Sequence, residues 1–559
     1  MFQRSLFLML MLLCINAPLL HAQEIDAEKT YPVYQEQPDD PYLPPDRTGQ
    51  WTSPPYQDLR GDIWTIQVNV DEAGMNIIND AANEPSMAVD PTNPDRIVIG
   101  WRQFDNINSN FRQAGQAYSD DGGTTWTAPE VIDPGVFRSD PVLDFDKEGT
   151  FYYNSLTTVN GDYVCDVFSS TAYNDWDDGI YAYGGDKQWM VVDRTDGPSQ
   201  GNIYAQWKSY LSACPPGDFT RSLDGGISFD PCSPVTGSPQ RGTLSVGPDG
   251  TVYTFGQVNN GFLMARSVNA KDPAVTPTWT VSAVDLNGSI GLYQGPNPSG
   301  MLAQAWVATD HSNTETHGNV YAVCSVFPDN PSDPLDVMFA SSTDGGQTWN
   351  APVRINDDLP GNWQWFGTIA VAPNGRIDVA WLDTRNDPGG YDSALYYSFS
   401  EDGGESWSPN EQLSETFDPH LGWPNQQKIG DYMHMISTDE GAHLTWPATF
   451  NGEQDVYYSF ITPDVMSATP NIEETETTFT ITPNPFRKSA NLEFALSEKT
   501  FVQLDVYDTN GQQVLKVFEG IKEAGVHHEI LSSLTTSGVY YCQLMIDGQL
   551  IHTEKLVVY

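Results

Sequence analysis

Four short segments of one pattern decide the fold of this 559-residue chain: SDDGGTTW at residues 119–126, SLDGGISF at 222–229, STDGGQTW at 342–349 and SEDGGESW at 400–407. Each follows the scheme Ser-x-Asp-x-Gly-x-(Thr/Ser)-aromatic and comes after a strand-like run such as GQAYS. The Asp carboxylate can accept backbone N–H bonds within a tight turn, and the later Gly tolerates positive φ. Four copies indicate an internally repeated β-structure.

Outward from these segments, each repeat contains two further strand-like runs. An inner strand ends in a turn, as in TIAVAPNG at 368–375, and a second strand follows, as in RIDVAWLD at 376–383. The repeats recur every 50 to 70 residues, and a unit without a box near residue 461 brings their number to seven. The isolated strand at 62–70 is expected to supply the outer strand of the last unit, which would remove exposed sheet edges.

These boxes resemble the Asp-boxes, or BNR repeats, of the sialidase superfamily of β-propellers. The resemblance implies an all-β fold in which each box lies between the third and fourth strands of a blade and has a structural role. We expect a seven-bladed β-propeller over residues 61–465, with six blades as the alternative because the sialidases proper have six. The box residues to which this structural role carries over are Asp121, Asp224, Asp344, Asp402, Trp126, Phe229, Trp349 and Trp407.

The N-terminal residues 1–22 have the pattern of a secretory signal peptide. Arg4 precedes an apolar run from Ser5 to Leu13, and small residues lead to an exit at Ala22. The run is too short and interrupted to span a bilayer, so we expect no stable transmembrane segment after cleavage. Residues 23–60 are rich in Pro and Asp and are expected to form an extended arm, and 466–478 a linker.

Residues 479–559 read as short alternating strands with turns at Asn510-Gly511 and Asp547-Gly548, which predicts a small β-sandwich. The opening PNPF, the VYDTNGQQV hairpin, the GVYYCQL strand and the closing KLVVY resemble the C-terminal sorting domain of the type IX secretion system of the Bacteroidetes. The resemblance implies the type IX machinery as a partner, passage across an outer membrane, and release or surface attachment.

Charge and cysteines agree with export. With 26 Lys plus Arg against 74 Asp plus Glu, the net charge of −48 argues against a nucleic-acid partner, which requires a basic surface. An oxidising compartment permits disulfides, and Cys214 and Cys232 are the expected pair because they bracket one hairpin.

A binding site is expected where inner strands begin and second strands end, here termed the mouth face, because propeller ligands usually bind there. The resemblance to sialidases implies a site with an arginine cluster for the sugar carboxylate, a tyrosine beside a carboxylate and an acidic group as general acid. The catalytic candidates are Tyr432, Glu84 and Asp140, and the substrate-binding candidates are Arg102, Arg138, Arg241, Arg385 and Trp365; Lys187 shares the face without an assigned role. The Arg-Ile-Pro signature of sialidases is missing, and each arginine could instead pair with a carboxylate to tie blades together.

Three functions therefore stay open, and so does the question whether the protein is an enzyme. The main hypothesis is a secreted or cell-surface propeller that recognises extracellular glycan or glycoprotein, with or without hydrolysis of acidic-sugar bonds. The second is a polysaccharide lyase that uses Tyr432 with His420 or His434 and Arg385 on a uronate. The third is a non-catalytic scaffold, for which Trp363, Trp365 and Trp423 offer stacking faces. A structural Ca²⁺ is a further hypothesis, based on Asp105, Asp140, Asp186 and Asp431.

Overall fold

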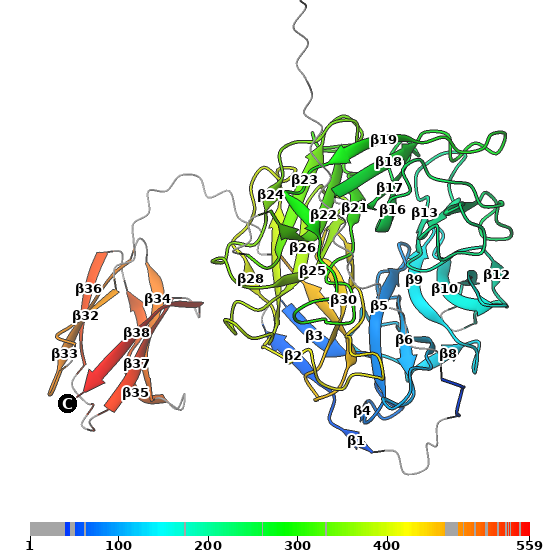
Figure 1. The fold of residues 1–559 in the computed structure, drawn as a ribbon. Coiled ribbons are helices and arrows are strands. Elements are labelled where there is room, and N and C mark those ends of the chain that lie inside the picture. Colours follow the sequence, from blue (N-terminus) through cyan, green and yellow to red (C-terminus); the bar gives the residue numbers. More distant parts are fainter. Residues whose placement is uncertain are drawn as a thin grey trace, which may run out of the picture. The chain divides into compact units, whose positions relative to one another are not determined.

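The computed structural model describes residues 40–44, 51–60, 63–172, 175–259, 261–329 and 333–463, and 479–558 with short gaps at 485, 497–498, 509–512, 523–524, 532–533, 535, 537 and 547–548. The predicted signal peptide, most of the arm and the linker 466–478 lie outside these residues. The chain divides into two units, Met1–Asp464 and Val465–Tyr559. All regular secondary structure in the described residues is β-strand, as the sequence predicts (Figure 1).

The first unit is a series of small antiparallel sheets, each built mainly from strands consecutive in the chain. The first four sheets, in pairing order, are β5 (Ala81–Val89), β6 (Ile97–Phe104), β7 (Gln113–Ser119) and β8 (Glu130–Ile132); β9 (Ser139–Phe145), β10 (Phe151–Val159), β11 (Asp162–Ser170) and β12 (Ile180–Tyr181); β13 (Trp189–Val192), β14 (Ile203–Gln206) and β15 (Phe219–Ser222); and β16 (Gln240–Val246), β17 (Val252–Val258), β18 (Gly261–Ser267) and β19 (Thr280–Val284).

Three further sheets continue the series. In the next, β20 (Gly288–Ile290) and β21 (Trp306–Thr309) both pair with β22 (Val320–Pro328), followed by β23 (Asp336–Ser342) and β24 (Val353–Arg354). After it come β25 (Gln364–Val371), β26 (Ile377–Asp383), β27 (Ala394–Ser400) and β28 (Glu411–Gln412), and then β29 (His434–Ser437), β30 (Ala442–Ala448), β31 (Asp455–Ile461), β3 (Ile63–Gln67) and β2 (Gln57–Arg60). A separate pair joins β1 (Thr52–Ser53) to β4 (Asn76–Ile77).

The inner strands connect these sheets to one another. β5 packs against β9, β9 against β13, β13 against β16, β16 against β21, β21 against β25, and β25 against β29. β29 in turn packs against β5, so the last sheet of the series contacts the first. β3 pairs with β31 in the register Ile63 to Ile461, which is the pairing predicted for the isolated N-terminal strand.

The Asp-boxes form the hydrogen bonds that their sequence predicts. Asp121 Oδ1 accepts the backbone N–H of Thr125 at 2.9 Å, and Asp121 Oδ2 accepts its hydroxyl at 2.7 Å. The other three boxes repeat these bonds. The hydrogen bonds from Thr348 lower the pKa of the Asp344 carboxyl group to about 2. Because each of these hydrogen bonds to an Asp carboxylate is local, the box folds as one turn.

The boxes also join neighbouring sheets. The ring of Trp126 meets that of Tyr458 in β31 edge-on, with centroids 5.4 Å apart. Gly123 lies against the same Tyr458 with φ of 88°, and a Cβ there would fall 2.3 Å from the ring. Trp407 packs likewise on Phe339 of the preceding sheet at 5.0 Å. The box aromatic therefore stabilises contacts between sheets as well as its own hairpin.

The second unit consists of two sheets that share one core. β32 (Phe479–Thr482), β33 (Ala490–Leu496) and β36 (Gly525–Leu531) form one sheet, and β35 (Gln513–Lys522), β34 (Thr500–Asp508), β37 (Gly538–Ile546) and β38 (Gln549–Val558) the other. Buried side chains of both, including Phe494 and Leu504, form a single cluster. This is the β-sandwich predicted from the sequence; the predicted turn residues lie outside the described residues, but the flanking strands pair.

Candidate functional site

Strained backbone recurs where the inner strands begin. Non-glycine residues with positive φ occupy this place in five sheets: Glu84 (51°), Asp140 (46°), Lys187 (56°), Arg241 (54°) and Phe366 (58°). In β5, β16 and β25 the strand register shifts at the same point, which marks a β-bulge. Such conformations cost about 1–3 kcal/mol each for side chains with a Cβ, and bulges redirect side chains. Repeated bulges thus set the side chains at this level of the mouth face.

Six charged side chains from this region form one continuous chain of ion pairs. Arg102 Nε lies 3.2 Å from Glu84 Oε2, and Lys428 Nζ lies 3.3 Å from Glu84 Oε1. Lys428 Nζ is also 2.8 Å from Asp431 Oδ2. Lys187 pairs with the same Asp431 and, at 3.6 Å, with Asp140. All six side chains are at least 89% buried, since the most exposed of them, Lys187, shows 11% of its surface.

The environment separates the pKa values of the three carboxyl groups. Burial raises the pKa of Glu84 to about 7, although Arg102 and Lys428 oppose this. Burial also disfavours ionisation of Asp140 and Asp431, but Lys187 holds the pKa of both below the usual range. When all six groups are ionised, three cations face three carboxylates. The cluster therefore has no excess positive charge with which to bind an acidic ligand.

Tyr432, the predicted catalytic tyrosine, is a core residue. It is 3% exposed, its hydroxyl donates to the carbonyl oxygen of Pro141 at 2.8 Å, and its ring packs edge-on against Trp189 at 5.5 Å. Burial raises its pKa far above the ordinary value. The phenol thus connects two sheets, rather than serving as the nucleophile or base that the sequence suggests.

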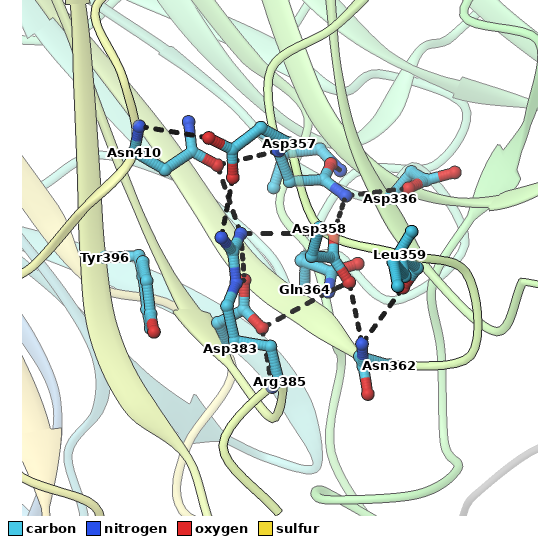
Figure 2. Close-up of polar contacts among 12 residues, drawn as sticks. Asp336, Asp357, Asp358, Leu359, Asn362, Gln364, Asp383, Arg385, Tyr396 and Asn410 are labelled. Carbon is cyan, nitrogen blue, oxygen red and sulfur yellow. Dashed lines mark hydrogen bonds and ion pairs between the residues drawn. The ribbon is translucent and has the colours of Figure 1, made fainter. Parts of the chain in front are cut away.

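Arg385 is held by a network of acidic and amide side chains (Figure 2). Its Nε donates to Asp383 at 2.9 Å, Nη1 to Asp357 at 2.6 Å, and Nη2 to Asn410 at 3.1 Å. The guanidinium also lies over the ring of Tyr396, 4.3 Å from its centroid. Because all three nitrogens are engaged, Arg385 ties the loops around it together rather than presenting the substrate contact predicted from the sequence.

The remaining predicted contacts are likewise satisfied within the protein. Arg138 pairs with Asp133 and Asp166, both at 2.8 Å, and Arg241 donates to Gln257 at 2.8 Å. Trp365 is fully buried and donates its indole N–H to Ser393, so it offers no face to a sugar. Arg102, Arg138 and Arg385 thus pair with carboxylates and Arg241 with an amide oxygen; the pairs Arg138–Asp133 and Arg385–Asp357 join neighbouring sheets, whereas Arg102–Glu84 and Arg241–Gln257 lie within one sheet.

Two further sequence predictions concern covalent and metal structure. Cys214 and Cys232 form the expected disulfide, with Cα atoms 6.4 Å apart. In the described residues, no group of three or more His, Cys, Asp or Glu is placed to hold a metal. Of the acids considered for Ca²⁺, Asp186 pairs with Lys208, while Asp140 and Asp431 pair with Lys187.

Lys428 is the member of the ion-pair chain that was not predicted from the sequence; Lys187 was placed on the mouth face without a role, and Asp431 was considered only as a Ca²⁺ ligand. Lys428 lies in a long loop whose pattern gives no strand position from which to infer a direction. A weaker signal was available for the bulges, because Glu84 and Asp140 are followed by Pro, and Arg241 and Phe366 by Gly. Pro and Gly mark interruptions of a strand ladder.

No described helix of the chain has the length and apolar character needed to cross a membrane. No curated protein matches the chain. Solved structures similar to it include a protein of unknown function from Dyadobacter fermentans, at 15% identity, covering 72% of this chain and 99% of that one, with a TM-score of 0.39. A mutant of the NanB sialidase from Streptococcus pneumoniae matches at 12% identity, 68% of each chain and a TM-score of 0.36.

A Trypanosoma rangeli sialidase matches at 11% identity, 89% of this chain and 90% of that one, with a TM-score of 0.35. Likenesses at these TM-scores carry no inference about activity. The family matches are local and specific: the BNR/Asp-box repeat at residues 117–128 and the secretion system C-terminal sorting domain at 480–559. The chain thus bears an Asp-box repeat and a type IX sorting domain, which directs it to the cell surface or the extracellular space.

Proposed function

We propose that residues 61–465 form a seven-bladed β-propeller that binds extracellular glycan or glycoprotein on its mouth face without cleaving it. Seven successive sheets whose inner strands contact one another in order, from β5 round to β29 and back to β5, support this architecture. So does the N-terminal strand β3, which completes the last sheet. The sorting domain supports an extracellular ligand.

The observation that carries a binding function over hydrolysis is the self-neutralised ion-pair chain. An acidic sugar needs unpaired cations, and Arg102, Lys187 and Lys428 are already matched by Glu84, Asp140 and Asp431. Removing those carboxylates from their partners would leave buried charges uncompensated, which is costly. Hydrolysis by a tyrosine nucleophile is also disfavoured by the burial of Tyr432.

The lyase hypothesis loses one of its two candidate histidines, His434, for the same physical reason. His434 is buried, and burial lowers its pKa to about 3. Its Nδ1 is 3.2 Å from the backbone N of Met87 and 3.1 Å from Ser86 Oγ. A group placed in this way stays neutral and engaged at neutral pH, so it supports packing of the inner strands rather than elimination chemistry.

The test compares binding with turnover on the same preparation. The mature full chain is screened on a glycan array and incubated with the bound glycans, and new reducing ends and unsaturated uronate ends are assayed. We expect binding without either product. Sustained release of either kind of end, abolished by a variant at the mouth face, would refute the proposal.

One observation favours glycoside hydrolysis as a second candidate. Glu84, with a pKa near 7, lies in one cluster with two carboxyls of lowered pKa, and such separated values suit a proton donor beside an ionised carboxylate. In that case Glu84→Gln would abolish hydrolysis and leave glycan affinity within about twofold. The burial of all three groups is what places this candidate second.

A further inference from the structure

A row of aromatic rings extends across three loops of the mouth face. Trp363 precedes β25, Tyr391 lies between β26 and β27, and His420 and Trp423 lie between β28 and β29. Adjacent ring centroids are 6.2 Å apart from Trp363 to Tyr391, 5.3 Å from Tyr391 to His420, and 5.0 Å from His420 to Trp423. These four residues, here called the aromatic row, contact one another edge to face, with interplanar angles of 63–67°.

The row is partly accessible, unlike the ion-pair chain: Tyr391 is exposed, and Trp363, His420 and Trp423 are half-buried. Tyr391 exposes 40% of its surface, and Leu421, in the same loop as Trp423, exposes 41%. Leu359, in the loop before Trp363, exposes 82%. Large apolar side chains that stay exposed together mark an interaction surface more often than chance exposure does.

Hydrogen bonds within the protein hold the loops that carry the row. The Thr384 N–H donates to the carbonyl oxygen of Trp363 at 3.0 Å, and the Trp363 N–H donates to Thr384 Oγ1 at 2.9 Å. Asn362 donates to Asp358 at 2.8 Å and to the carbonyl oxygen of Leu359 at 3.0 Å (Figure 2). The Trp423 indole donates to the carbonyl of Pro419 at 2.8 Å. A preformed surface loses little conformational entropy when a ligand binds.

The charges around the row select the chemistry of that ligand. The segments 359–363, 386–393 and 418–427 contain Asp387, Asp392 and Asp418, and they contain no Lys or Arg. Carboxylates repel an acidic sugar but accept hydrogen bonds from neutral hydroxyl groups. Aromatic faces cover the apolar C–H faces of pyranose rings, while the carboxylates at the edge can orient their hydroxyls.

We infer that the aromatic row binds an uncharged oligosaccharide, with successive sugar rings stacked along Trp363, Tyr391 and Trp423. This assignment rests on the proposed function and narrows it in two respects, the location of the site and the neutrality of the ligand. It also separates glycan binding from the ion-pair chain, which has a structural role.

The experiment measures affinity by isothermal titration of the mature full chain with neutral hexasaccharides of xylan, cellulose and mannan, and with hexagalacturonate and 3′-sialyllactose as acidic probes. Tyr391→Ala should weaken binding of the preferred neutral probe about tenfold, the usual range for truncating a central aromatic contact. Tyr391→Phe should retain affinity within about twofold. Tyr181→Ala, at a tyrosine of similar exposure in another sheet, is the matched control and should change nothing.

The outcomes separate a wrong assignment of the aromatic row from a wrong proposed function. If the wild type binds a neutral probe and Tyr391→Ala and Trp423→Ala bind it equally well, the aromatic row is not the site, and the proposed function stands. Preference for an acidic probe overturns the assigned neutrality. Absence of binding to every glycan overturns the proposed function and this inference together.

Discussion

Replacement of Lys187 by methionine tests whether the ion-pair chain is a desolvated structural element. Lys187 is the cation shared by Asp140 and Asp431, and both carboxylates are at most 5% exposed as side chains. Methionine keeps most of the side-chain volume but removes the charge. Breaking a buried pair from one side leaves an uncompensated charge and costs about 3–5 kcal/mol.

That cost translates into a measurable melting shift. An unfolding entropy of about 2.1 cal/mol/K per residue over about 400 residues gives about 0.8 kcal/mol/K, so Lys187→Met should lower Tm by about 4–6 °C. Scanning calorimetry of the mature chain at pH 7.5 measures it. Lys147→Met is the control, because Lys147 pairs with Asp196 at the surface, where the two side chains are 38% and 92% exposed. A surface pair contributes about 0–1 kcal/mol, so the control should shift Tm by about 1 °C or less.

Equal melting temperatures for the two variants would refute the reasoning. They would mean that Asp140 remains hydrated without Lys187, and hence that water reaches the cluster, since Asp431 keeps Lys428 as a partner. The same access would admit a substrate, and Glu84 would then become the foremost candidate for an acid catalyst.

Three further predictions follow from the fold. Gly123→Ala should destabilise the protein far more than Gly161→Ala. Both glycines have positive φ, but only a Cβ added at Gly123 would meet a ring, that of Tyr458, at 2.3 Å. Urea unfolding measures the difference in stability. The free energy of unfolding should fall as the pH drops from about 6.5 towards 3, because His434 has a pKa of about 3 in the folded protein and binds a proton only after unfolding. Unfolding curves measured across this pH range should show a weaker pH dependence for His434→Gln. Cys214→Ser should lower stability by about 2–4 kcal/mol, measured against wild type with and without reductant, since the bond closes an 18-residue separation.

Much of the fold was predictable because its determinants are local. The hydrogen bonds of the Ser119 and Asp121 side chains link residues at most four apart, so the pattern of Ser119 to Trp126 specifies its turn locally. The strand pattern at 62–70 gave the right pairing for β3 because one unit lacked an outer strand. The disulfide of Cys214 followed from a single hairpin.

The candidate site was predictable only as a set of residue types on one face. Glu84, Asp140 and Arg102 do lie in one cluster, together with Lys187 and Asp431. Which partner each residue takes was not readable, because Lys428 meets Glu84 across 344 residues of sequence and Tyr432 meets Pro141 across 291. No local pattern encodes such pairings.

The sequence by itself therefore determined the all-β repeat architecture, the box turns and the export signals, since each depends on neighbours within a few positions. Only the tertiary structure decided that Arg102, Arg138 and Arg385 are matched by carboxylates, and that Trp365 is buried while Tyr391 is exposed. The physical reason is that burial and ion pairing depend on how the sheets pack. Residues of the same type therefore occur both in buried and in exposed positions.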